Sequence, residues 1–171
     1  MSFPPEGFRL ALLDRSHRRK RFSSGDRRVD EWLRQKALGA SEKNTSTTRV
    51  LLTGDDIAGY YTLANTALDV SLVPLELFGG QAPRRPAPTL TLAWLGVDER
   101  YAGRGLGTRL LGRALADCVQ VYGLVRYVAV IVDALTERNY AFYRAQGFEP
   151  VPGTTHKLYL SATTLLDIVE S

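Results

Sequence analysis

Apolar side chains recur at helical spacing in four segments of the chain. Residues 27–41 follow the turn SSGD, whose polar residues suit a helix start, and they predict a helix with a basic outer face. Residues 106–119 predict a second amphipathic helix, and residues 137–146 predict a third that ends at Gly147. The final segment, TTLLDIVES, predicts a short helix.

Short β-branched or aromatic runs between these helices predict strands. The polar segment 41–48 and the Gly- and Pro-rich segment 79–88 predict loops, of which the second suits a hinge or a flap. Asp55-Asp56 predicts a hairpin turn. The expected strands cover residues 8–14, 49–54, 57–73, 89–98, 127–134 and 156–162.

The element order is β, α, several β, then β-α-β-α-β, which indicates an α/β or α+β fold with a mixed sheet. The chain has 171 residues, so we expect a single domain over residues 1–171. No window approaches 18 consecutive apolar residues and the N-terminus lacks a signal-peptide core, so we expect a cytoplasmic protein away from membranes. Cys118, the only cysteine, lies in an apolar helical run and is interpreted as a buried packing thiol.

Positive charge is concentrated near the N-terminus. Residues 1–36 hold ten Lys/Arg against five Asp/Glu, whereas the remaining 135 residues carry a net charge of −1. The peak is RSHRRKR at 15–21, in which His17 is expected to be solvated. A run of this kind is either a solvated surface or a phosphate-binding footprint, and without interleaved aromatic residues it suits phosphate contact better than base stacking.

The stretch RYAGRGLGTRLL, residues 100–111, places three glycines between an expected strand and an expected helix. A helix start presents unpaired N–H groups and partial positive charge, and glycine lets an anion approach the backbone closely. The stretch contains neither the Gly-Lys-Ser/Thr of a P-loop nor the dinucleotide fingerprint. From the pattern alone, a phosphate-bearing ligand and an ordinary helix entry both remain open.

A second stretch, NYAFYRAQGFEP at 139–150, puts several aromatic residues on one short helix. The two stretches together resemble the GNAT family of N-acetyltransferases over residues 89–150. FSSGDRRVDEWLRQKA, SEKNTSTT and RVLLTGDDIAGYYTLA are similar to the toxin branch of that family, so the resemblance runs over about residues 8–160. It implies a mixed, mostly antiparallel sheet with a splayed central strand and flanking helices.

The resemblance also implies a site for acetyl-CoA, with no metal. The end of the central strand would offer backbone groups to the acetyl and pantetheine arm, with Val97 N–H a candidate donor to the oxyanion. The loop would cradle the pyrophosphate, and Tyr143 would protonate the departing thiolate. The implied cofactor-binding residues are Leu95, Gly96, Val97, Gly103, Arg104, Gly105, Leu106, Gly107 and Thr108.

Two positions depart from the family pattern. Ala102 stands where Gln or Arg is usual, and Thr136 stands where many members have Asn, with Asn139 out of register. No residue is a convincing general base, because Asp98, Glu149 and His156 are each interpreted as surface or structural groups. Trp32 and Trp94 are interpreted as packing in the core or beside CoA.

The sequence leaves three functions open. The first is a toxin that acetylates the amino group of aminoacyl-tRNA, with Arg18, Arg19, Lys20 and Arg21 as candidate tRNA contacts. Its implied partners are a ribbon-helix-helix antitoxin and a second copy in a homodimer. The second is an acetyltransferase of a small amine, a protein N-terminus or lysine. The third is a non-catalytic module that binds CoA.

Overall fold

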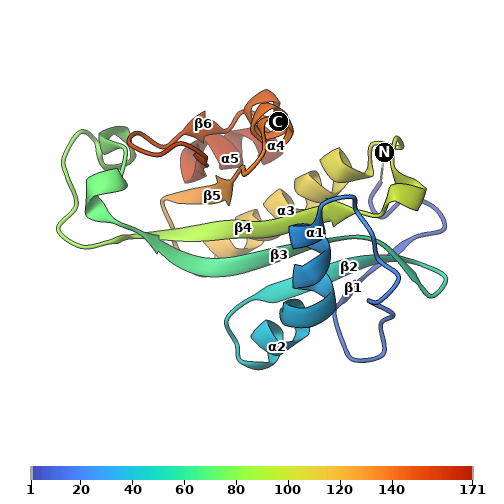
Figure 1. The fold of residues 1–171 in the computed structure, drawn as a ribbon. Helices are drawn as coiled ribbons and strands as arrows, with labels where there is room; N and C mark the ends of the chain where they lie inside the picture. Colours follow the sequence, from blue (N-terminus) through green and yellow to red (C-terminus); the bar gives the residue numbers. More distant parts are fainter. Residues whose placement is uncertain (1, 171) are drawn as a thin grey trace. The chain divides into compact units, whose positions relative to one another are not determined.

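A computed structural model describes residues 2–170 of the chain. Figure 1 shows its helices and strands. The strands are β1 (Arg9–Leu12), β2 (Thr47–Thr53), β3 (Asp56–Leu68), β4 (Ala87–Val97), β5 (Ala129–Asp133), β6 (Glu149–Pro150) and β7 (Lys157–Ser161). The helices are α1 (Arg27–Glu31), the π-helix η1 (Trp32–Lys36), α2 (Ala37–Glu42), α3 (Leu106–Tyr122), α4 (Glu137–Ala145) and α5 (Ala162–Glu170). Short 3-10 turns are η2 (Val70–Leu72), η3 (Leu75–Phe78) and η4 (Glu99–Tyr101).

The strands form a seven-stranded sheet in the order β1-β2-β3-β4-β5-β7-β6. β4 and β5 pair in parallel, while β1 with β2, β2 with β3, and β7 with both β5 and β6 pair antiparallel. The parallel ladder joins Thr89–Thr91 to Ala129–Ile131 and stops there, although β4 continues to Val97. This confirms the expected mixed, mostly antiparallel sheet with a central strand that leaves its neighbour.

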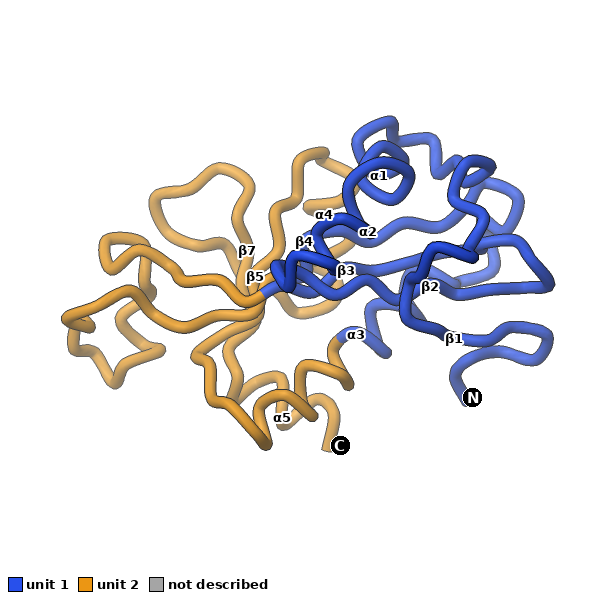
Figure 2. The backbone as a smooth tube through the Cα atoms, turned by 90° about the horizontal axis from the view of Figure 1, so that it is seen from below, with its two compact units in different colours: residues 1–64, 92–114 blue, residues 65–91, 115–171 orange. Residues whose placement is uncertain are grey.

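Contacts divide the chain into two compact units, coloured separately in Figure 2. Unit 1 contains residues 1–64 and 92–114, and unit 2 contains residues 65–91 and 115–171. The single domain over residues 1–171 therefore stays a prediction.

The core of unit 1 forms where α1, η1 and α2 pack on one face of the sheet. Phe22, Leu33 and Tyr60 are at most 1% exposed, and they cluster with Val50 and Leu52. The Tyr60 hydroxyl donates to the Val29 carbonyl at 2.6 Å, which ties α1 to β3. Burial and nearby carboxylates raise the pKa of Tyr60, so this donor keeps its proton.

Unit 2 has a core of its own under β5 and β7. Ala129 and Ile131 of β5 pack with Tyr159 of β7, Leu68 and Val151. Cys118 is fully buried, and burial raises the pKa of its thiol to about 12, which supports a packing role. None of the helices within residues 2–170 combines the length and apolar character needed to cross a bilayer.

The structure corrects several expected boundaries. Residues 27–42 are helical, but the turn at 32–36 is π-helical. The strand expected over 57–73 is wrong beyond Leu68, because Asp69 caps a 3-10 turn by accepting from the Ser71 N–H. The hairpin turn is Gly54-Asp55 rather than Asp55-Asp56, since Gly54 takes a left-handed φ of 57°.

Candidate active site

The glycine loop exposes backbone N–H groups at the start of α3. Gly103 and Gly105 have φ values of 76° and 74°, in a left-handed region that residues with a Cβ rarely adopt. A Cβ at either position would meet nothing within 4 Å, so open space lies in front of the backbone. Within residues 2–170, no acceptor is bonded to the N–H groups of residues 103–108. The loop therefore has the donors and the room that a bound anion needs.

Backbone groups at the end of β4 are also available. Asp98 N–H donates to the Ala58 carbonyl of β3 at 2.8 Å. Since successive strand residues direct their backbone groups to opposite sides, those of Leu95 and Val97 point away from β3. Both residues lie past the last pair with β5 and are only partly buried.

Gly96 has a different reason to be glycine. A Cβ there would lie 2.5 Å from Cγ1 of Val29 and within 3.5 Å of Phe22 and Tyr60. The missing side chain lets α1 approach the end of β4 directly. Gly96 is therefore required by packing rather than by an unusual backbone angle.

Asp98 anchors the loop instead of acting in the open site. Its buried carboxylate accepts from the Ser23 N–H at 3.1 Å and from Arg100 Nε at 2.9 Å, and Arg100 also pairs with Asp56 at 3.3 Å. Burial works to raise the pKa of Asp98, but the hydrogen bonds from Arg100 and Ser23 prevail and hold it below its usual range. Asp98 is thus a structural carboxylate, as the sequence indicated.

The N-terminal segment lies against the same loop. Arg109 Nη2 donates to the Ser2 carbonyl at 2.5 Å, and the Phe8 ring meets Tyr101 edge-on at 6.1 Å. The guanidinium of Arg104 lies 5.5 Å from the centre of the Tyr101 ring. The Arg104 side chain is exposed, whereas Arg109 is partly buried and bonded to the Ser2 carbonyl.

Tyr143 lies in unit 2, on α4. The centre of its ring lies 5.1 Å from that of Phe142 and 5.4 Å from that of Phe148, and the residue is 8% exposed. Within the described part of the chain the hydroxyl has no hydrogen-bond partner, and its oxygen is not fully enclosed. Burial raises the pKa of Tyr143 to about 12, so the hydroxyl keeps its proton at neutral pH.

A cavity of about 470 Å³ opens at the N-terminus of α4. Thr136, at the position of the family's Asn, lines it and caps α4 by accepting from the Asn139 N–H at 3.1 Å. Tyr140 and His156 also line this cavity. The His156 ring lies 3.0 Å from the Thr155 hydroxyl and 3.9 Å from the Asp133 carboxylate.

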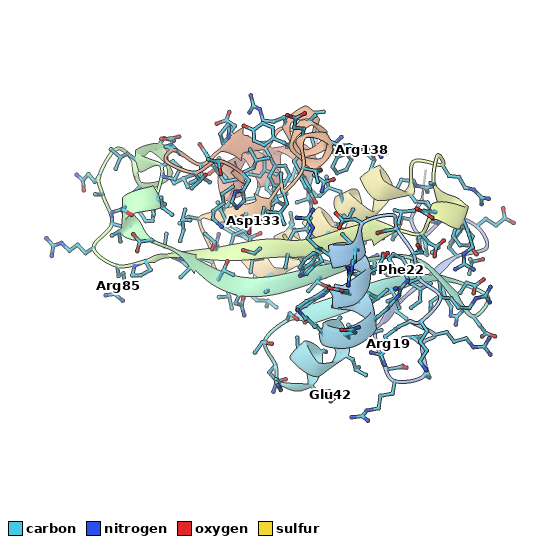
Figure 3. All side chains as sticks on the ribbon, in the orientation of Figure 1. Arg19, Phe22, Glu42, Arg85, Asp133 and Arg138 are labelled. Atoms are coloured by element: carbon cyan, nitrogen blue, oxygen red, sulfur yellow. The ribbon has the colours of Figure 1, made fainter. Side chains whose placement is uncertain are left out.

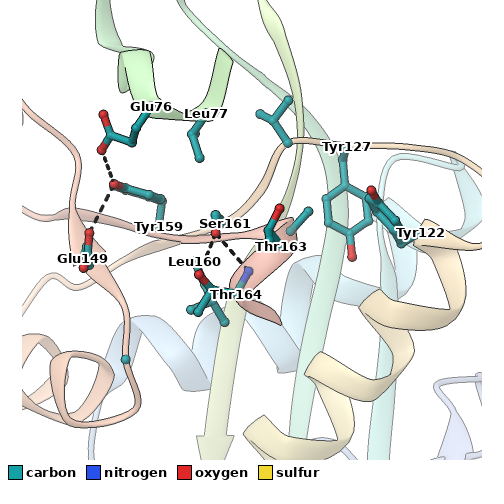
Figure 4. A pocket seen from close by; sticks show the side chains of 13 residues that line it. Glu76, Leu77, Tyr122, Tyr127, Glu149, Tyr159, Leu160, Ser161, Thr163 and Thr164 are labelled. Atoms are coloured by element: carbon teal, nitrogen blue, oxygen red, sulfur yellow. Dashed lines mark hydrogen bonds between the residues drawn. The ribbon is translucent and has the colours of Figure 1, made fainter. Parts of the chain in front are cut away.

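Another cavity of unit 2, of about 550 Å³, is shown in Figure 4. The Tyr159 hydroxyl sits between two carboxylates there, 2.8 Å from Glu76 and 3.3 Å from Glu149. Glu149 is therefore engaged by a tyrosine. No residue expected to bind acetyl-CoA or to act as the acid lines this cavity.

Much of the basic run at 15–21 is already paired within unit 1. Arg15, Arg18 and Arg21 reach Glu42, Asp55 and Asp56 at 2.8, 3.7 and 3.7 Å. Arg19 donates to the Arg34 carbonyl at 3.3 Å, beside the helical segment in Figure 3. Among the described residues Lys20 has no partner.

Two features of this run and its surroundings differ from the sequence reading. His17 is not solvated: its side chain is 11% exposed and accepts from the Asp14 N–H. The anchoring role of Arg100 was missed, although the spacing Asp98-x-Arg100 after a strand is a recognisable capping signal. Residues 2–170 contain no group of three or more His, Cys, Asp or Glu side chains suited to a metal ion.

These features define a class of protein. The sheet has a central parallel pair that stops short of the end of β4. A glycine loop with free N–H groups precedes α3. Together these two features are typical of an acyltransferase that takes its acyl group from a CoA thioester. The chain belongs to the acetyltransferase (GNAT) family, whose sequence model matches residues 10–148. It is an acetyltransferase, and acetyl-CoA is its cosubstrate.

Two curated relatives are named as toxins. The chain is 34% identical over 134 residues to a "tRNA-acetylating toxin" of Mycobacterium tuberculosis, which covers 77% of this chain and 78% of the relative. It is 26% identical over 167 residues to the "Probable toxin TacT" of Sinorhizobium fredii, covering 90% of each.

Among solved structures, AtaT complexed with acetyl-methionyl-tRNAfMet has a TM-score of 0.85 and 20% identity. The match covers 96% of this chain and 99% of AtaT. At this identity the likeness shows the fold.

Proposed function

We propose that the protein is a toxin that acetylates the α-amino group of aminoacyl-tRNA. The observation that carries the proposal is the 34% identity, over 77% of the chain, to a protein named for that activity. The fold shared with AtaT, which has been solved with acetyl-methionyl-tRNAfMet, supports it.

The donor side of the site is assigned to unit 1. Leu95 and Val97 would hold the acetyl and pantetheine arm through backbone groups, and Val97 N–H would bind the thioester oxygen. The N–H groups of residues 103–108 would bind the pyrophosphate, with exposed Arg104 adding positive charge. Because these contacts come from the backbone, Ala102 is compatible with the site.

Tyr143 is assigned as the acid. Transfer forms the amide C–N bond and breaks the thioester C–S bond, while the amine loses a proton and the thiolate gains one. An unpaired tyrosine hydroxyl with a pKa of about 12 holds that proton across the neutral range. The carboxylates of Asp98 and Glu149 are engaged in the fold, so we assign the proton of the amine to water.

The acceptor side is assigned to the basic run, with Lys20 as its unpaired cation and Arg18, Arg19 and Arg21 beside it. AtaT has been solved with the C-terminus of its antitoxin AtaR, and this supports an antitoxin partner here. We extend the proposal to a ribbon-helix-helix antitoxin, a homodimer and a cytoplasmic location.

The proposal is tested with purified aminoacyl-tRNA and labelled acetyl-CoA. We expect label on the α-amino group, and we expect Tyr143→Phe to abolish most of the transfer. Wild-type protein that acetylates small amines or protein N-termini but no aminoacyl-tRNA would contradict the assignment and favour the second function. Binding of CoA without turnover on any amine would favour a non-catalytic module.

A further inference from the structure

The chain's two tryptophans are stacked on each other beside the end of β4. The rings of Trp32 and Trp94 lie 5.6 Å apart between centres, at an angle of 15°. Both side chains pack against the buried core of unit 1, yet both are only partly buried. An aromatic pair of this size that keeps part of its surface open is available to an apolar ligand.

The position of Trp32 is held by three features of the fold. Its Nε1 donates to the Thr62 hydroxyl at 2.9 Å, and Thr62 in turn bonds the Thr48 hydroxyl at 2.7 Å. Trp32 also opens the π-helical turn η1, and single π-helical turns occur frequently at functional sites. The indole is therefore fixed in orientation rather than free on the surface.

Trp94 is adjacent in the chain to the backbone assigned to the acetyl group. Its Cα lies about 3.8 Å from that of Leu95, the spacing of neighbouring residues. Trp94 and Gly96 share one face of β4, and α1 closes that face over Gly96 through Val29. The stacked pair is thus a partly exposed aromatic surface beside the backbone assigned to the acetyl group.

We propose that the Trp32–Trp94 pair receives the side chain of the amino acid carried by the tRNA. The inference rests on the proposed function. In an aminoacyl ester the reacting amine and the side chain are attached to the same carbon, whereas the terminal adenine lies beyond the ester and the ribose. A surface beside the transfer point therefore meets the amino-acid side chain, and two indoles select a large apolar one.

The test compares one tRNA body charged with glycine or with phenylalanine. For the wild type we expect kcat/KM to be at least about tenfold higher with phenylalanine, the range that apolar pockets achieve. Trp94→Leu and Trp32→Leu should bring this ratio close to one. Leu38→Ala is the matched control, because Leu38 packs against the same core cluster outside the stack, and it should keep the ratio.

Fluorescence gives a second readout, since the pair contains every tryptophan of the chain. A non-hydrolysable 3′-phenylalanylamino-adenosine should change the wild-type emission, and the glycyl analogue should change it far less. Equal kcat/KM for the two tRNAs, or a ratio that survives both tryptophan substitutions, would overturn the inference while the toxin function stands. Absence of transfer to any aminoacyl-tRNA would instead overturn the proposed function and the inference with it.

Discussion

Gly103 and Gly105 occupy left-handed backbone at the point where free N–H groups face open space. Gly107, by contrast, lies inside α3, and a Cβ built there would lie 3.9 Å from Cγ2 of Val97, an ordinary contact distance. The three glycines of the motif therefore have unequal roles: the first two shape the loop, and the third sits close to the strand.

Gly105→Ala should raise the KM for acetyl-CoA at least about tenfold, because a Cβ in this conformation costs about 1–2 kcal/mol and would distort the loop. Gly54→Ala is the control, since Gly54 has a φ of 57° and equally open surroundings in a hairpin turn. Both variants should lose similar thermal stability, and only the loop variant should lose affinity in isothermal titration with CoA. Equal affinity in the two variants would remove the loop from the donor site.

Tyr143 gives a pH prediction at the same scale. Its pKa is raised by burial from 10.0 to about 12, so this proposed acid stays protonated and kcat should not fall between pH 8 and 10 on its account. Tyr143→Phe should lower kcat by about 10²–10⁴-fold with little change in KM. The raised pKa also means that stability contributed by the neutral ring is full below pH 10 and is lost as the pH rises towards 12. A tyrosine-dependent decline in kcat centred below pH 9 would contradict this assignment.

At the scale of elements, the helix over residues 27–42 is not uniform. At the π-helical turn 32–36, Trp32 Nε1 donates to the Thr62 hydroxyl. Before this turn, the Val29 carbonyl accepts from the Tyr60 hydroxyl. Apolar spacing in the sequence predicted the helix, but a single π-helical turn leaves that spacing almost unchanged. The π-helical turn is therefore seen only in the structure, where Trp32 and Val29 bond to Thr62 and Tyr60 of β3.

Tyr60→Phe should lower the free energy of unfolding by about 0.5–1.5 kcal/mol, the usual net value of one hydrogen bond. We expect the lower part of that range, because the Val29 carbonyl also accepts from the Trp32 N–H. Tyr140→Phe removes a hydroxyl that has no partner within residues 2–170 and should change stability little. Denaturant melts of both variants test this, and equal losses would show that the bond to α1 contributes nothing.

Local sequence predicted the glycine loop, α3 and the end of α4 at Gly147 well, because each is set by neighbouring residues. Two other kinds of feature were predicted less well. β3 stops where Asp69 caps a 3-10 turn, a local signal that apolar content alone did not indicate. Asp98 and Ser23 are 75 positions apart, and Trp32 and Trp94 are 62 apart, so no local pattern reports that they meet.

At the scale of the whole molecule, the excess of positive charge near the N-terminus is partly neutralised by carboxylates of the same chain. Residues 1–36 carry the net +5, yet three arginines of the run at 15–21 face Glu42, Asp55 and Asp56. These exposed pairs are individually weak, but they lower the positive potential that a polyanion would meet.

The affinity of the proposed tRNA complex should therefore depend on salt less steeply than the five Lys/Arg side chains of residues 15–21 suggest. We expect a slope of log K against log salt of about −1 to −2, since each neutralised phosphate contributes about −0.7 to −0.9. Lys20→Glu should reduce the magnitude of the slope, whereas Lys43→Glu, outside the run, should leave it unchanged. Filter binding from 50 to 200 mM salt measures this, and a slope near −5 would show that the arginines leave their carboxylates on binding.

The bond from Arg109 to the Ser2 carbonyl has a practical consequence for handling the protein. An affinity tag fused ahead of residue 2 would lie beside α3, the helix that follows the glycine loop. Its bulk and charge would disturb the binding of acetyl-CoA at that loop. A tag after residue 170 would extend from α5, which shares none of these contacts. We expect purification through the C-terminus to preserve the KM for acetyl-CoA, and cleavage of an N-terminal tag to restore it.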